Sequence, residues 1–222
     1  MSLRGGARLF EPGERVPDLK EEMRARALGF KAVAGVDEAG RGPLAGPVVA
    51  AAVILPERIS RRSALFKLRD SKQLSASRRE ELFDLIMDQA VAVGLGEASP
   101  EDIDRFNIFQ ASLMAMYRAV DALPVAADFC LVDGIHPLPF PPSKSIIKGD
   151  MFCLSIAAAS IVAKVARDRK MLEYSRIYPA YNFAKNKGYA TADHKQALAI
   201  FGPSPIHRLS FEPVKVCLRR NP

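Results

Sequence analysis

Residues 33–42 decide the fold and read Val33-Ala34-Gly35-Val36-Asp37-Glu38-Ala39-Gly40-Arg41-Gly42. An apolar strand leads into two adjacent carboxylates and then into a glycine-rich turn. Two acids inside so much apolar sequence are costly unless a partner compensates their charge. Neighbouring strand side chains point to opposite faces, so Asp37 and Glu38 share one site only where the strand ends. The glycines beside Arg41 let the backbone turn tightly and approach a ligand.

This stretch has two interpretations. A β-hairpin with two solvated acids near its turn would contain the same residues. The flanking apolar runs and the arginine between two glycines favour the second interpretation, in which the strand forms one side of an active site. Strands are expected at 32–38 and, through the apolar run from Pro47 to Leu55, at 44–55.

Further along the chain, helices and strands alternate. Ser77 and Glu80 form a capping-box pattern at the start of one helix. Ser99 as N-cap and Pro100 at the first helical position mark the start of another. The other expected elements are strands at 91–95, 129–132 and 144–147 and helices at 151–174 and 191–201. This order predicts an α/β fold, a mixed β-sheet flanked by helices, with a helical and basic C-terminal region.

The domain organisation follows from composition. A chain of 222 residues that is 49% hydrophobic can bury one sizeable core. We expect an N-terminal extension at 1–30 that packs loosely, one catalytic domain at 31–216 and a tail at 217–222. We also expect a monomer.

No apolar run reaches the ~18–20 residues of a membrane span, and no signal peptide is visible, so we expect a cytoplasmic protein. Three cysteines in apolar settings suit buried free thiols in a reducing compartment: Cys130, Cys153 and Cys217.

Positive charge is concentrated in the last third of the chain. Residues 141–222 hold 14 Lys and Arg against 5 Asp and Glu, while the whole chain has a net charge of +7. Such an excess is expected where a protein lies along a polyanion. A solvated basic surface without a specific ligand would have the same composition.

Four carboxylates lie at the ends of predicted strands, each near a glycine: Asp37, Glu38, Asp133 and Asp150. Such strand ends can meet at one edge of a sheet. Crowded carboxylates repel one another unless a cation is present, and oxygen ligands select Mg²⁺ or Mn²⁺. Two such ions can activate a water and stabilise the leaving oxygen of a phosphodiester.

Several polar residues have a structural interpretation. Asp150 precedes the long helix and has an alternative role as its N-cap. Asp168, between two arginines, is interpreted as an ion-pair residue. His194 and His207 are interpreted as surface histidines, with a role as proton shuttles as the alternative.

The quoted stretch, with Ala45-Gly46-Pro47-Val48-Val49 after it, resembles the first motif of the bacterial ribonuclease HII enzymes. Later segments resemble further motifs of that family, in the expected order over residues 32–216. These segments are Asp70-Ser71-Lys72-Gln73-Leu74-Ser75, Leu131-Val132-Asp133-Gly134, Lys148-Gly149-Asp150, Lys187-Gly188-Tyr189 and Ile206-His207-Arg208-Leu209-Ser210-Phe211. The resemblance implies a ribonuclease-H-like fold.

The resemblance also implies an activity. It is that of an endoribonuclease that hydrolyses the RNA strand of RNA–DNA hybrids and cuts 5′ of ribonucleotides embedded in DNA, leaving 3′-hydroxyl and 5′-phosphate ends. The four acids would hold two Mg²⁺ or Mn²⁺ ions. By the same resemblance the Gly40-Arg41-Gly42 turn reads the ribose 2′-hydroxyl, and Tyr189 packs on the sugar at the RNA–DNA junction.

Lysines near these motifs are expected to contact phosphates. Lys185 and Lys187 alternate with aromatic residues in the segment 183–191, a pattern that suits stacking and backbone contact with nucleic acid. Lys72 suits a phosphate contact as well, although a solvated loop before a helix explains it almost as well.

Two other functions remain open. One is a non-catalytic nucleic-acid-binding module whose acids hold a structural Mg²⁺, and four acids argue against it because one structural ion rarely needs them all. The other is a different two-metal phosphotransferase, such as a DNA exonuclease or an integrase-like enzyme. The Gly40-Arg41-Gly42 turn together with Tyr189 argues against an enzyme that acts on DNA alone.

Overall fold

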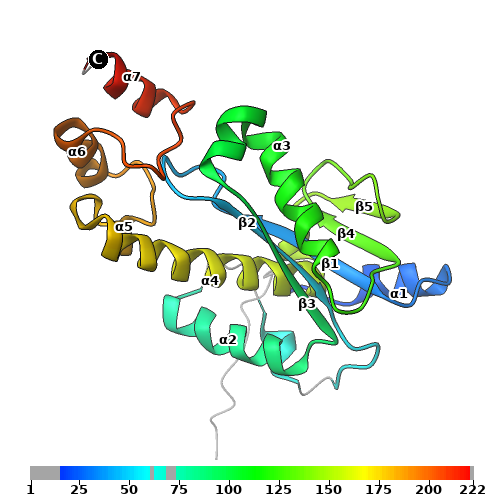
Figure 1. Ribbon diagram of the computed structural model, residues 1–222. Helices are drawn as coiled ribbons and strands as arrows, with labels where there is room; N and C mark the ends of the chain where they lie inside the picture. The colour runs from blue at the N-terminus through cyan, green and yellow to red at the C-terminus, as the bar shows by residue number, and fades with distance from the viewer. Residues whose placement is uncertain (1–15, 61–62, 69–73, 221–222) are drawn as a thin grey trace, which may run out of the picture.

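A computed structural model describes residues 16–60, 63–68 and 74–220, and its centre is a five-stranded sheet (Figure 1). The strands lie in the order β3-β2-β1-β4-β5. β1, β2 and β3 are antiparallel, whereas β1, β4 and β5 are parallel, so the sheet is mixed as predicted. Their bounds are β1 Val33–Ala39, β2 Val48–Ile54, β3 Ala92–Ala98, β4 Phe129–Asp133 and β5 Ser143–Ile146.

Helices cover both faces of this sheet. The described α-helices are α1 Lys20–Ala27, α2 Ala76–Gln89, α3 Pro100–Asp121, α4 Leu154–Ile177, α5 Phe183–Asn186, α6 Ala192–Phe201 and α7 Glu212–Arg220. Short 3₁₀ turns are η1 Ala64–Lys67, η3 Gly149–Met151 and η4 Pro179–Tyr181. α3 packs on one face, and α4 packs on the other with α2 outside it. The predicted fold class is confirmed.

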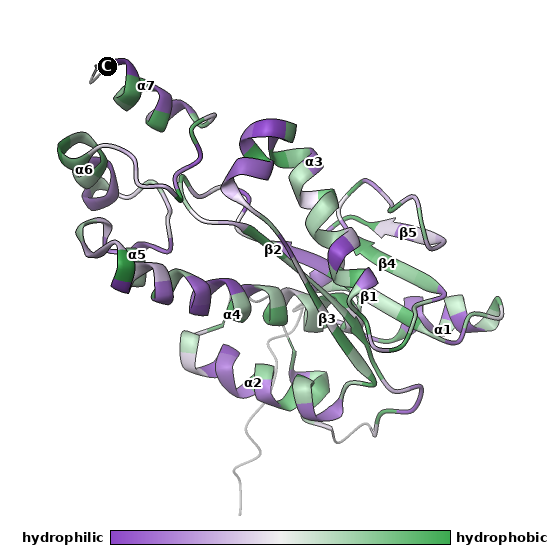
Figure 2. Ribbon diagram, in the orientation of Figure 1, coloured by the Kyte–Doolittle hydropathy of each residue, from purple (hydrophilic) through white to green (hydrophobic). Residues whose placement is uncertain are grey.

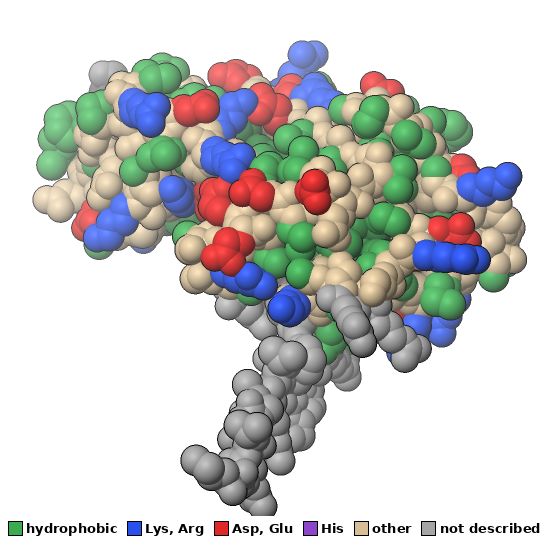
Figure 3. Space-filling model, turned by 90° about the horizontal axis from the view of Figure 1, so that it is seen from below, with side chains coloured by type: hydrophobic (Ala, Val, Ile, Leu, Met, Phe, Trp, Pro, Cys, Tyr) green, Lys and Arg blue, Asp and Glu red, His purple; other side chains and the backbone are tan. Residues whose placement is uncertain are grey.

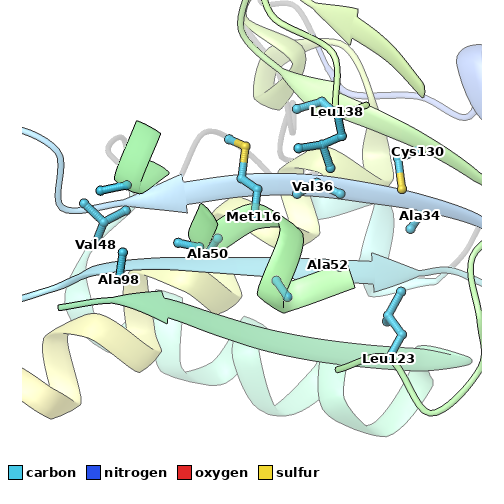
Figure 4. Close-up of a cluster of buried hydrophobic side chains, with 14 of the residues drawn as sticks. Ala34, Val36, Val48, Ala50, Ala52, Ala98, Met116, Leu123, Cys130 and Leu138 are labelled. Carbon is cyan, nitrogen blue, oxygen red and sulfur yellow. The ribbon is translucent and has the colours of Figure 1, made fainter. Parts of the chain in front are cut away.

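The core explains why β2 is apolar at every position. Alternate strand residues face opposite sides, and both sides are covered. Ala50 and Ala52 lie in the cluster with Met116 of α3 (Figure 4), whereas Ala51 and Val53 lie in the cluster formed with α2 and α4. Figure 2 accordingly colours the central strands largely as hydrophobic.

One approach between backbone elements is especially close. A Cβ added to Gly35 in β1 would lie 2.2 Å from the carbonyl carbon of Ser155 in α4. Only glycine fits there, so β1 and α4 meet backbone to backbone at this point. This contact fixes α4 close to the strand that carries Asp37.

The second strand is shorter than expected, because residues 44–46 pair with the C-terminal part of the chain. Leu44 N–H donates to the Gly188 carbonyl at 2.8 Å, and Gly46 N–H donates to the Ile206 carbonyl at 2.8 Å. Gly46 has a φ of +83°, outside the strand region, and Pro47 follows it. β2 therefore begins at Val48.

Helix ends differ from the expectation at two places. α2 begins at Ala76 and Ser75 is its N-cap, with its hydroxyl accepting from the Arg78 N–H at 3.2 Å, so the cap predicted at Ser77 is wrong. The N-cap predicted at Ser99, with Pro100 after it, is confirmed, and Asp102 is the reciprocal partner in a capping box. α3 is kinked at Asn107, whose φ is 68° and whose side chain caps the second half by accepting from Phe109 N–H.

The segment before residue 31 is not loosely packed over its described part, residues 16–30. Glu22 of α1 is buried, and its carboxylate accepts from the Ser155 N–H at 2.8 Å. Asp18 forms a bridge with Cys153. The three cysteines are buried, as expected. No helix among the described residues has the length and hydrophobicity needed to cross a membrane.

Candidate active site

The parallel pairing of β1 and β4 brings two acids to neighbouring strand ends. The register pairs Val36 with Val132, and the next residues are Asp37 and Asp133. Asp37 is buried, and Asp133 is half-buried. Burial, the charge of Glu38 and the charge of Asp133 raise the pKa of the Asp37 carboxyl well above its usual value, against a hydrogen bond from Ser160 that lowers it. Repulsion of this kind is what a bound cation would relieve.

Glu38 follows in β1 and has one carboxylate oxygen without a partner. Its Oε1 accepts from the Arg41 guanidinium at 3.1 Å, whereas its Oε2 is buried and has no hydrogen-bond partner among the described residues. A buried carboxylate oxygen without a donor is unfavourable, and it is a suitable ligand for a cation.

Asp150 lies in η3 and is not the N-cap of the long helix. α4 begins at Leu154, and its N-cap is Cys153. That alternative role for Asp150 is therefore wrong. Asp150 is buried, and the N–H of the preceding Gly149 donates to Asp133 Oδ1 at 2.6 Å. This bond ties the segment that carries Asp150 to the end of β4.

The donor set fits a hard divalent cation, although the side chains would have to turn to bind it. Among residues 16–60, 63–68 and 74–220, no three His, Cys, Asp or Glu side chains already form a group that could hold a metal ion. The acids supply only oxygen donors, which suits Mg²⁺ or Mn²⁺. A bound cation would compensate both the Glu38 oxygen without a donor and the raised pKa of Asp37.

The glycine turn borders a cavity of about 240 Å³ beside Glu38. The cavity is lined by Glu38, Ala39, Gly40, Arg41, Gly42, Ser160, Lys164 and Tyr189. Gly40 has a φ of +96°, and a Cβ there would lie 2.0 Å from the Arg167 Nε, so the turn requires glycine. A Cβ on Gly42 would lie 3.8 Å from Tyr189 Cε1, which places the tyrosine ring directly beside the turn.

A second cavity, of about 360 Å³, shares Arg41 and includes Asp133. Its other wall is the second half of α3, with Phe109 in edge contact with His136 at 4.7 Å between ring centroids. The Arg41 side chain is exposed and borders both cavities. The kink at Asn107 redirects α3 next to this wall.

The predicted lysine contacts have different surroundings. Lys185 is exposed and Lys187 is half-buried, on the segment that precedes Tyr189. Lys72 lies outside the described residues. Phe183, in the same segment, is fully buried against Tyr181 and is a core residue, so it offers no surface for stacking.

The two histidines are buried, so the prediction that they lie on the surface is wrong. His194 Nε2 and His207 Nε2 are 2.9 Å apart. His207 Nδ1 accepts from the Ser204 N–H at 2.9 Å, so its proton is on Nε2 and points to His194. His194 then carries its proton on Nδ1 and donates to the Tyr189 carbonyl at 2.8 Å. Both rings are neutral in this arrangement, and they support the backbone of Tyr189.

Sequence patterns missed the residues that α4 contributes to this region. Ser160 and Lys164 are four residues apart, which places them on one helix face, and both line the cavity at the glycine turn. Their positions follow the small residues that let α4 approach the sheet, and this spacing is the signal that could have identified them. Asp168 pairs with Lys164 at 2.5 Å, which confirms its interpretation as an ion-pair residue.

Comparisons with known proteins find relatives of one family. A sequence model of the Ribonuclease HII family matches residues 34–214. Ribonuclease HII of Geobacter sulfurreducens is 53% identical over 206 residues, which are 92% of each chain. Ribonuclease HII of Geobacter metallireducens is 57% identical over 188 residues, covering 84% of this chain and 86% of the relative. The crystal structure of ribonuclease H2 from Pyrococcus horikoshii OT3 has a TM-score of 0.73 at 27% identity, covering 86% of this chain and 98% of that one.

Proposed function

Because this chain belongs to the ribonuclease HII family of endoribonucleases that act on RNA–DNA hybrids, we propose that it also cuts duplex DNA 5′ of a single embedded ribonucleotide. The products are 3′-hydroxyl and 5′-phosphate ends. As a member of this family the protein is a hydrolase, so the non-catalytic binding module no longer applies. We further propose that it acts as a monomer.

The proposed catalytic groups are the four acids Asp37, Glu38, Asp133 and Asp150. Enzymes of this family depend on divalent metal ions, and these acids would hold two Mg²⁺ or Mn²⁺ ions. When bound, such ions supply activation of the attacking water and stabilisation of the leaving 3′ oxygen. Ser160 orients Asp37 through a hydrogen bond, and the Lys164 ammonium adds positive charge to the cavity wall.

The proposed recognition groups are the glycine turn and Tyr189. The 2′-hydroxyl both donates and accepts hydrogen bonds, so groups of the turn backbone can distinguish ribose from deoxyribose. The exposed ring of Tyr189 packs on the adjoining deoxyribose. Lys185 and Lys187 contact phosphates of the bound duplex, and Lys72 remains a predicted contact of the same kind.

The observation that carries this proposal is the cavity of about 240 Å³ at the end of β1. It joins Glu38, the Gly40-Arg41-Gly42 turn and Tyr189 in one space. A ribose held by the turn is therefore next to a carboxylate of the proposed catalytic group. A nuclease without ribose recognition would not need this juxtaposition.

The experiment measures kcat/KM on a DNA duplex with one ribonucleotide and on a long RNA–DNA hybrid, with Mn²⁺ or Mg²⁺ at fixed salt. An all-DNA duplex serves as the third substrate and should remain uncut. Tyr189→Ala should lose activity on the single-ribonucleotide duplex at least about tenfold more than on the hybrid, as expected when one ring–sugar contact is removed.

Tyr117→Ala is the matched control, because Tyr117 on α3 and Tyr189 are each 45% exposed. This control should keep the wild-type ratio of the two kcat/KM values. If Tyr189→Ala also keeps that ratio, Tyr189 is a packing residue and the proposed reading of the junction is wrong.

A further inference from the structure

Two arginines are buried directly beneath the recognition turn without a carboxylate to pair with. Arg167 is 1% exposed and Arg208 is 0% exposed. Neither forms an ion pair with any residue that the structure describes. A buried guanidinium is costly, and each of the two donates to backbone carbonyls. Arg208 also lies over the ring of Phe211, at 5.1 Å to its centroid. The carbonyls that each arginine holds therefore show what it positions.

Arg208 uses its side-chain donors on the turn itself. Its Nη2 donates to the Gly40 carbonyl at 2.5 Å, and its Nη1 donates to the Arg41 carbonyl at 2.8 Å. Nε and Nη2 also donate to the Gly46 carbonyl, at 3.0 and 2.8 Å. The planar fork of arginine is suited to holding several acceptors in a fixed geometry, which a lysine ammonium does not reproduce.

These bonds determine where the peptide N–H groups of the turn point. In a planar trans peptide, the N–H points opposite to the carbonyl of the same unit. The Gly40 carbonyl shares its peptide with the Arg41 N–H, and the Arg41 carbonyl shares its peptide with the Gly42 N–H. With both carbonyls drawn inward by Arg208, both N–H groups point outward, and neither has an acceptor among the described residues.

We propose that Arg208 is the positioning residue that presents the Arg41 and Gly42 N–H groups to the ribose of the substrate. This inference rests on the proposed function, in which the turn reads the 2′-hydroxyl. The Arg208 side chain is 0% exposed, so it acts through the turn that it holds. Two N–H groups held in advance at the cavity wall bind a hydroxyl oxygen without first having to be ordered.

The charge of Arg208 strengthens the same donors. Burial and the nearby charge of Arg167 lower the pKa of Arg208 to about 9, so the guanidinium remains charged at neutral pH. A carbonyl that accepts from a cation polarises its peptide, and its N–H becomes a better donor. Replacement by a neutral side chain would remove both the geometry and this polarisation.

Arg167 supplies a matched control. It is as deeply buried as Arg208 and also donates to three backbone carbonyls, those of Ala45, Pro47 and Lys187. None of these carbonyls belongs to the peptides that carry the Arg41 and Gly42 N–H groups. Lysine at either position keeps the charge but loses the fork, so the two variants carry similar structural costs.

The test measures the Kd of a DNA duplex with one ribonucleotide and of the same all-DNA duplex, by fluorescence anisotropy in EDTA so that neither is cut. The discrimination ratio is Kd for DNA divided by Kd for the ribonucleotide duplex. Arg208→Lys should lower this ratio about tenfold, the size of one misplaced hydrogen bond, and leave the affinity for all-DNA within about twofold. Arg167→Lys should keep the wild-type ratio.

Three results would overturn the inference. The ratio could stay at the wild-type value in folded Arg208→Lys, or it could fall equally in both variants, which would make the role of Arg208 merely structural. A wild-type ratio near one would remove the proposed reading of the 2′-hydroxyl, and the inference with it. Failure of the proposed reading is therefore distinguishable from failure of the role of Arg208, because the wild-type ratio is measured without any variant.

A measurement on the unmodified protein tests the two N–H groups that Arg208 is proposed to position. It remains available if Arg208→Lys fails to fold. In ¹⁵N-labelled wild-type protein, the Arg41 and Gly42 amide resonances should move on addition of the ribonucleotide duplex, and much less on addition of the all-DNA duplex. Equal movement with both duplexes, or no movement, would contradict the proposed role of the two N–H groups.

Discussion

At the scale of single residues, Asp37 illustrates how the fold places a charge where it is unfavourable without a partner. Burial and two neighbouring carboxylates raise its pKa. A raised pKa means that the folded state favours the protonated form. That contribution to stability is present below the ordinary value near 3.8 and is lost as the pH rises through the folded pKa. At neutral pH the ionised Asp37 carboxylate therefore lowers the free energy of unfolding of the metal-free protein.

Asp37→Asn should raise the stability of the metal-free protein at pH 7.5 by on the order of 1 kcal/mol, because it removes the charge and keeps the shape. Cleavage should fall by orders of magnitude. Urea denaturation in EDTA and with added Mn²⁺ measures the stability, and Mn²⁺ should stabilise wild type more than the variant. The kcat/KM on the single-ribonucleotide duplex measures the cleavage. Asp121→Asn, at an exposed position on α3, should behave as wild type. Near-normal cleavage by Asp37→Asn would contradict its proposed role.

The histidine pair leads to a prediction about pH. Burial lowers the pKa of His194, and burial together with His194 lowers the pKa of His207 from 6.5 to about 4. A lowered pKa means that the unfolded chain takes up the proton first. Stability that is present above about 6.5 is therefore lost as the pH falls toward 4, by up to about 1.4 kcal/mol per pH unit for each proton.

His207→Gln removes one of these titrations and should weaken the loss of unfolding free energy between pH 6.5 and 5, although the variant is less stable at pH 7.5. The measurement is the urea midpoint at several pH values. His136→Gln changes the exposed histidine and should follow the wild-type curve. An unchanged slope in His207→Gln would show that the pair is already protonated in the folded protein.

At the scale of elements, α4 connects the sheet to the region around the Gly40-Arg41-Gly42 turn. It brings Ser160 and Lys164 to the cavity, and Arg167 lies below the turn. Its N-cap residue, Cys153, makes no side-chain cap. Glu22 of α1 supplies the missing acceptor to the Ser155 N–H, and a carboxylate at a helix N-terminus also interacts favourably with the helix dipole.

Glu22→Ala should therefore lower the free energy of unfolding by about 1–3 kcal/mol, since it leaves the buried N-terminus of α4 without its acceptor. Urea denaturation measures the change. Glu21→Ala on the same helix is the control, because Glu21 pairs with the partly exposed Lys144 and should contribute less than about 1 kcal/mol. Equal effects of the two substitutions would remove the capping role of Glu22.

The elements that the sequence predicted well are those with a local signal. The strand at Val33–Ala39, the N-cap at Ser99 and the long helix rich in small residues follow from periodicity and caps. The pairing of residues 44–46 with Gly188 and Ile206 depends on contacts far along the chain, which no local pattern reveals. The same reason explains why α1 was expected to pack loosely.

At the scale of the whole molecule, the excess of positive charge in residues 141–222 does not make every face of the protein uniformly basic. On the face shown in Figure 3, lysine and arginine side chains are interspersed with acidic ones. Two of the arginines in this part of the chain are buried beneath the turn. Composition predicted a basic region, but it could not distinguish cations that reach a ligand from cations that hold the backbone.

Affinity for an RNA–DNA hybrid should fall steeply with salt, with log K decreasing by roughly 0.7–0.9 per unit of log salt for each phosphate contact. Lys185→Ala with Lys187→Ala should flatten this slope by up to about two contacts. Lys20→Ala on α1, at the far end of the chain, should leave the slope unchanged. Titrations at several salt concentrations provide the test, and an unchanged slope in the double variant would place the nucleic acid elsewhere.

The site as a whole was only partly readable from the sequence. Strand ends and glycines made Asp37, Glu38 and Asp133 candidates, and the parallel register places Asp37 and Asp133 at neighbouring strand ends. The histidines were misjudged because burial depends on Tyr181 and Phe183 packing around them. Arg208 lay within a family motif, but its role depends on carbonyls 162 to 168 residues earlier in the chain.

The separation between Arg208 and the turn has a consequence for the order of synthesis. A ribosome that has translated the chain as far as Asn186 has already incorporated all four acids and the five strands. Neither Tyr189 nor Arg208 has yet been translated at that stage. The part proposed to select a sugar is therefore completed after the acids proposed to break the bond, so in this proposal a growing chain acquires its selectivity last.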